Sequence, residues 1–92
     1  MRLKPSVRIL GIKPELVLGA LIVESCYAAI DVDPVVTVGT EGHRSTHRAG
    51  LALDIALPEH GREDLVHAVR DALGPDYEVI YLEDEIHVAF TG

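Results

Sequence analysis

Hydrophobic residues recur along the chain with two different spacings, and these distinguish predicted helices from predicted strands. Residues 16–30 are apolar on nearly all sides of a helix that begins near Pro14, so we expect this helix to be largely buried. Residues 62–73 carry apolar side chains at helical spacing with charged ones between them, and Gly74 and Pro75 end the segment. The pattern therefore predicts one core helix and one amphipathic surface helix.

Four other segments have the composition or the alternation of β-strands. They are residues 35–38, 51–57, 77–82 and 85–90. A short acidic turn separates the last two segments, which predicts a hairpin. A further segment, residues 6–10, fits either a short edge strand or an extended arm. We expect an α+β fold in which a small, mostly antiparallel sheet packs against two helices.

Two of the predicted strands have one face of large apolar residues and one face that carries an ionisable residue. Residues 51–57 place Asp54 between two alanines on the face opposite the leucines and the isoleucine. In residues 85–90, His87 shares its face with Ala89 and lies opposite the large side chains. The large residues should pack on the core helix. Both ionisable residues therefore project from the other face, where the alanines leave room for an ion.

Length and charge restrict the domain organisation and the partners. The 92 residues form one domain, whose core we place at about residues 12–90. A domain of this size buries little apolar surface, so a bound metal would add to its stability. The net charge of −7 disfavours binding to nucleic acid or to an anionic membrane surface. A chain that is 4% aromatic needs an aliphatic core.

The N-terminal region has a superficial likeness to a secretory signal, because basic residues precede the apolar run 16–23. Pro14, Glu15 and Glu24 do not fit that pattern, and the run is far shorter than the roughly 20 residues that span a bilayer. We therefore expect neither secretion by this route nor insertion into a membrane. Cys26 is the single cysteine, which excludes an intramolecular disulfide.

Three residues have the side-chain types of a zinc site. His47 lies in a polar loop seven residues before Asp54, and His87 lies in the last strand. A catalytic zinc site has three nitrogen or oxygen ligands and one open position for water. The spacing alone is common, but the shared orientation of Asp54 and His87 beside alanines supports a site. We predict one zinc ion bound by these three residues, whereas His67 on the polar face of its helix should be solvated.

A two-part motif carries a family resemblance. It consists of Ser45-x-His47-x-x-Gly50-x-Ala52-x-Asp54 and, later, Asp84-x-Ile86-His87-Val88. This motif resembles that of the zinc D-alanyl-D-alanine carboxypeptidases, which include vancomycin-resistance D,D-peptidases and phage L-alanyl-D-glutamate endolysins. The resemblance implies a hedgehog/DD-peptidase-like fold with the zinc site on the sheet. It also implies a peptidase whose substrate is a peptidoglycan peptide.

By position in the motif, the resemblance assigns a role to each site residue. The implied zinc ligands are His47, Asp54 and His87. The implied catalytic acid is Asp84, which would take a proton from zinc-bound water and return it to the leaving amine. Many relatives have a second histidine two positions before the last ligand, where this chain has Glu85. Strand alternation puts Glu85 on the face of His87 and makes it a rival base, but strand ends twist, and we assign the role to Asp84.

The resemblance also implies substrate-binding residues. Ser45 matches a serine that lies beside the substrate in relatives, and Arg44 or His43 would bind a peptide carboxylate or the oxyanion. The leading prediction is a zinc metallopeptidase that cuts peptidoglycan stem peptides at a bond involving a D-amino acid, as a D,D-carboxypeptidase or an L-alanyl-D-glutamate endopeptidase. We expect it in the cytoplasm, or as a phage product that reaches the cell wall through another component.

Two other hypotheses remain open at this point. One is a catalytically silent zinc-binding domain that recognises a peptide or protein partner, which would keep His47, Asp54 and His87 but would tolerate loss of Asp84 and Glu85. The other is a structural module without a metal, in which the five histidines are incidental.

Overall fold

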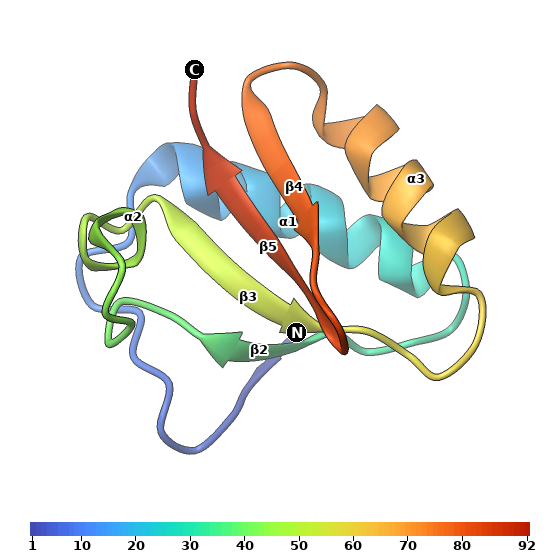
Figure 1. Cartoon of the computed structure of the whole chain (residues 1–92), viewed down its shortest axis with the longest axis horizontal. Coiled ribbons are helices and arrows are strands. Elements are labelled where there is room, and N and C mark those ends of the chain that lie inside the picture. Colours follow the sequence, from blue (N-terminus) through green and yellow to red (C-terminus); the bar gives the residue numbers. More distant parts are fainter.

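A five-stranded sheet with the strand order β1-β2-β3-β5-β4 carries the two long helices on one of its faces (Figure 1). The computed structural model describes all 92 residues. The strands are β1 (Arg2–Leu3), β2 (Val35–Val38), β3 (Ala52–Ala56), β4 (Tyr77–Tyr81) and β5 (Glu85–Phe90). The helices are α1 (Pro14–Ala28), α2 (Ser45–Arg48) and α3 (Arg62–Leu73). In Figure 1, α1 crosses behind the strands and α3 lies beside it at the β4 edge.

The predicted α+β class, the mostly antiparallel sheet and the two main helices are confirmed. The sheet is mixed, because β1 pairs in parallel with β2 while every other neighbouring pair is antiparallel. The edge strand lies at Arg2–Leu3, whereas residues 6–10 form no strand and have turns on either side. Pairing ends after Lys4, whose N–H donates to the Val36 carbonyl, because the chain then turns at residues 5–6, where the Val7 N–H donates to the Lys4 carbonyl.

The core lies between the helices and the face of the sheet that they cover. It is aliphatic apart from Tyr27, as the low aromatic content predicts. Its buried members are Leu16, Val23, Tyr27, Val36, Leu53, Ile55, Leu57, Leu65, Val66, Val69, Leu73, Ile86 and Val88. The strand residues among them alternate with Asp54 and His87 along the chain. The alternation thus directs the large side chains into the core and leaves the ionisable ones on the open face.

The prediction that the first helix is largely buried is wrong. The buried residues of α1 are Leu16, Gly19, Val23 and Tyr27. On its outer side, Val17, Leu18 and Leu21 are 43%, 57% and 59% exposed. A sheet with a single layer of helices covers only one side of each helix, so part of the apolar surface of α1 stays exposed to solvent. None of the helices is long and apolar enough to cross a membrane.

Tyr27 joins α1 to the strand that carries Asp54, because its hydroxyl donates a hydrogen bond of 2.9 Å to the Ala56 carbonyl. Burial raises the pKa of Tyr27, so the hydroxyl stays protonated and remains a donor. We expect Tyr27→Phe to lower the free energy of unfolding by about 1 kcal/mol, since the partly buried Ala56 carbonyl loses this hydrogen bond. Urea denaturation measures this change. Tyr81→Phe, at a 38% exposed side chain, is the control and should change the free energy by less than about 0.5 kcal/mol.

Candidate metal centre

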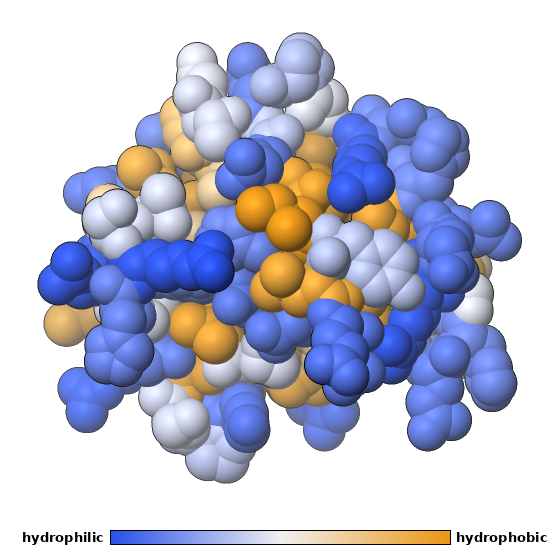
Figure 2. Space-filling view, in the orientation of Figure 1, coloured by the Kyte–Doolittle hydropathy of each residue, from blue (hydrophilic) through white to orange (hydrophobic).

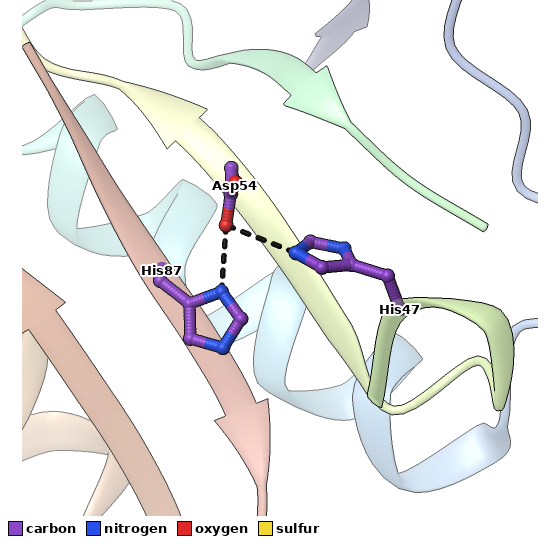
Figure 3. A group of neighbouring side chains, drawn as sticks. All are labelled: His47, Asp54 and His87. Atoms are coloured by element: carbon purple, nitrogen blue, oxygen red, sulfur yellow. Dashed lines mark hydrogen bonds and ion pairs between the residues drawn. The ribbon is translucent and has the colours of Figure 1, made fainter. Parts of the chain in front are cut away.

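Three buried ionisable side chains converge on the open face of the sheet (Figure 3). Asp54 and His87 lie directly opposite each other in the pairing of β3 with β5. His47 reaches them from α2, and its ring meets that of His87 edge-on with 5.0 Å between centroids. Asp54 Oδ1 lies 2.7 Å from His87 Nδ1 and 3.3 Å from His47 Nε2. All three potential ligand atoms lie within 4.8 Å of one another.

Burial of these three side chains destabilises the fold unless a partner or a ligand binds them. The exposed fractions of His47, Asp54 and His87 are 2%, 8% and 4%, and no other histidine or carboxylate of the chain is buried. Polar groups removed from water destabilise the fold when they lack partners, and His47 Nδ1 has none. A cation bound by the triad would offset the cost of burying the carboxylate between the two imidazole rings. The triad can hold one metal ion, and its imidazole and carboxylate donors suit zinc.

Small residues on β3 and β5 make the space for this group. Asp54 lies between Ala52 and Ala56 along the open face of β3, and Ala89 follows His87 on the same face of β5. Ala52 and Ala89 are directly opposite each other in the register. The predicted orientation of Asp54 and His87 away from the core is confirmed. The alternation of the sequence therefore placed two of the three potential ligands correctly.

The segment that carries His47 is a one-turn helix, α2, where the sequence predicted a loop. Two glycines fit this turn into the structure. Gly50 has a φ of +76° and approaches the carbonyl of Gly11 so closely that a Cβ would lie 2.1 Å from its oxygen. Gly42 packs on the His47 side chain, where a Cβ would lie 2.9 Å from the imidazole Cγ. The absence of a side chain at both positions lets α2 pack where His47 lies within reach of Asp54.

The two candidate bases lie on different sides of the sheet. Asp84, in the turn before β5, is exposed and pairs with Arg62 at the start of α3, with 3.1 Å between Oδ1 and Nη1. Glu85 lies on the open face and accepts a hydrogen bond of 2.5 Å from the Thr37 hydroxyl. This bond crosses β3 above Ala56, the residue directly opposite Glu85 in the register. The structure thus brings Glu85, and not Asp84, onto the face of the triad.

The predicted substrate-binding residues surround the start of α2. Ser45 is the first residue of the helix, Arg44 precedes it as N-cap, and His43 comes before both. All three are exposed, and their side chains make no hydrogen bond or ion pair within the chain. They are therefore free to bind a ligand beside His47. His67 is exposed on α3, as predicted.

Sequence reasoning missed two polar side chains near the centre, Thr37 and Glu41. The Glu41 carboxylate accepts hydrogen bonds of 2.9 Å from the backbone N–H groups of Arg8 and Gly39. Desolvation alone would raise the pKa of Glu41, but these N–H groups and the nearby His47 outweigh it, and the net shift is downward. Glu41 therefore acts as an ionised acceptor that connects two separate segments. Its position two residues after Gly39 in a tight turn is the only sequence signal of this role.

The three main surface hollows lie away from the triad. Figure 2 shows this face, with a small group of apolar side chains near the middle and hydrophilic ones around it. The largest surface hollow, of about 760 Å³, lies between α1 and α3 and is lined by residues such as Cys26 and Leu65. Two smaller hollows adjoin the N-terminal strand and the outer side of α1. None of these three is lined by a residue of the triad.

The chain was compared with protein-family models, with curated proteins and with solved structures, and no match was found in any of the three comparisons.

Proposed function

We propose that this chain is a zinc-dependent peptidase that hydrolyses peptidoglycan stem peptides at a bond involving a D-amino acid. The observation that carries the proposal is the convergence of His47, Asp54 and His87, each of which offers one potential ligand atom within 4.8 Å of the others. The spacing of these residues resembles the motif of the D-alanyl-D-alanine carboxypeptidases. A zinc ion bound by three such ligands lowers the pKa of a water molecule to about 7, which supplies a nucleophile at neutral pH.

A carboxylate on the open face would move the protons of this reaction. The prediction that Asp84 is the base stays a prediction, but its pairing with Arg62 on the helix side supports the alternative, Glu85. Thr37 holds the Glu85 carboxylate by a hydrogen bond, and Glu85 lies two residues before His87 on the same face of β5. From there, Glu85 can accept a proton from the attacking water and donate it to the leaving amine.

The exposed residues before α2 support recognition of an anionic group. Arg44 carries a guanidinium without an ion pair, and this group can bind a carboxylate through two parallel hydrogen bonds. Ser45 and His43 add a hydroxyl and an imidazole beside it. A peptide that lies along the open face would place its carboxylate here and its scissile bond above the triad. Stem peptides carry such carboxylates, at the chain end and on D-glutamate.

Digestion of purified peptidoglycan tests the proposal. Zinc-loaded protein should release new peptide ends that mass spectrometry identifies, and the masses would assign the bond that is cut. Asp54→Ala, which removes one ligand, is the matched inactive control. If the zinc-loaded wild type releases no new ends where a known lytic enzyme does, the peptidase proposal is contradicted.

A second candidate function rests on the burial of the centre. The side chains of His47, Asp54 and His87 are only 3%, 12% and 5% exposed, and no described hollow opens onto them. A domain with this geometry can bind zinc and use its open face to recognise a peptide or protein partner without hydrolysis. Stoichiometric zinc together with binding of intact stem peptide and no cleavage would favour this second function.

A further inference from the structure

The N-terminal arm (residues 4–13) is bonded to the ligand loop (residues 39–50) that carries His47. At one end of the loop, the backbone N–H and the backbone carbonyl of Arg8 both form hydrogen bonds. Its N–H donates to the Glu41 carboxylate at 2.9 Å, and its carbonyl accepts from the backbone N–H and the hydroxyl of Thr40 at 2.7 and 3.1 Å. Gly39 allows this contact, since a Cβ there would lie 2.1 Å from the Arg8 oxygen.

A second set of contacts joins the same two segments at the other end of the loop. The Lys13 N–H donates to the Gly50 carbonyl at 2.9 Å, and Gly50 packs directly on the Gly11 carbonyl. The ligand loop is therefore fixed to the arm both before and after His47. Of the side chains in these contacts, Glu41 is the one that bridges the segments with an ionised group, which makes its hydrogen bonds strong.

We propose that Glu41 is a positioning residue for His47, and that docking of the N-terminal arm is coupled to metal binding at the triad. This inference rests on the zinc binding in the proposed function. Glu41 holds the loop to the arm, and Gly42, the next residue, packs on the His47 side chain. Loss of the Glu41 hydrogen bonds lets the loop move relative to β3, so that His47 meets Asp54 and His87 in the ligand geometry less often.

Coupling between two equilibria is reciprocal. If the docked arm raises the affinity of the triad for zinc, then bound zinc must favour the docked arm to the same extent. This predicts an effect on residues that do not bind the metal. The backbone N–H groups of Arg8 and Thr40, which join the arm to the loop, should exchange with solvent more slowly when zinc is bound.

The test compares the zinc affinity of variants by competition with a chelator. We expect Glu41→Ala to weaken zinc binding about tenfold or more, within the usual range of such couplings. Glu41→Gln keeps an acceptor oxygen in place of the carboxylate and should restore most of the affinity. Glu59→Ala is the control, because it removes the same charge from an exposed side chain that makes no hydrogen bond or ion pair. The absorption spectrum of bound cobalt should change in Glu41→Ala only.

Hydrogen exchange of the wild-type chain completes the test without any variant. Slower exchange at Arg8 and Thr40 on addition of zinc supports the coupling, and unchanged exchange at both contradicts it. Equal zinc affinity of Glu41→Ala and Glu59→Ala, with wild type binding zinc, also overturns the inference while the proposed function stands. Absence of zinc binding by the wild type would instead overturn both.

Discussion

Zinc at a thousand times its dissociation constant is expected to raise the melting temperature of this chain by about 15–30 °C. Binding to the folded state alone adds about 4 kcal/mol at that ratio, and 1 kcal/mol shifts the melting temperature of a domain of this size by about 4–8 °C. The physical reason is local. The triad buries two imidazoles and a carboxylate, and a bound cation would offset the free-energy cost of removing these groups from water. The effect is large relative to the total stability because the core of this chain is small.

Calorimetry of protein purified without an affinity tag, with and without zinc, measures this shift. The quantity to compare is the rise in melting temperature that zinc causes in each variant, because each substitution also changes the stability of the metal-free chain. His47→Ala should lose most of this rise in melting temperature, whereas His67→Ala, at an exposed histidine of α3, should keep it. Less than about a tenth of an equivalent of zinc in the wild type, together with no shift on adding zinc, would contradict both functions proposed above.

The sequence predicted those parts of the centre that depend on local pattern. Alternation along β3 and β5 put Asp54 and His87 on one face, and the register then placed them opposite each other. The third residue, His47, was identified by its spacing, although its segment proved to be a helical turn instead of a loop. A single turn of helix has too few residues to show a period, so pattern alone does not reveal it.

The remaining parts depend on contacts between distant segments. Glu41 meets Arg8 across 33 residues, and Thr37 meets Glu85 across 48. A pattern within one strand or one loop carries no information about such partners. The exposed side of α1 was mispredicted for the same reason, since burial depends on how many layers the fold provides. Long-range pairing therefore decides which residues support the centre and which carboxylate lies on its face.

Glu85→Gln is expected to lower the rate of peptide hydrolysis by about 10²–10⁴-fold, the usual contribution of a general base, while the affinity for zinc changes little. The amide keeps an oxygen that can accept the Thr37 hydrogen bond, so the side chain should hold its place and lose only its ability to take a proton. Asp84→Asn is the matched comparison, because it neutralises the adjacent carboxylate. That change breaks only an exposed ion pair with Arg62, and such pairs contribute between about 0 and 1 kcal/mol to stability.

Single-turnover cleavage of a synthetic stem peptide by each zinc-loaded variant separates the two assignments, because it measures the chemical step rather than product release. Thr37→Val should give an intermediate loss, since the Glu85 carboxylate stays but its hydrogen bond is removed. If Asp84→Asn abolishes cleavage and Glu85→Gln does not, the base is Asp84, as the motif implies. The turn before β5 would then have to carry that carboxylate from Arg62 to the open face when the peptide binds. Equal and full activity of both variants would mean that neither residue moves the proton, and the proposed peptidase mechanism would need another base on this face.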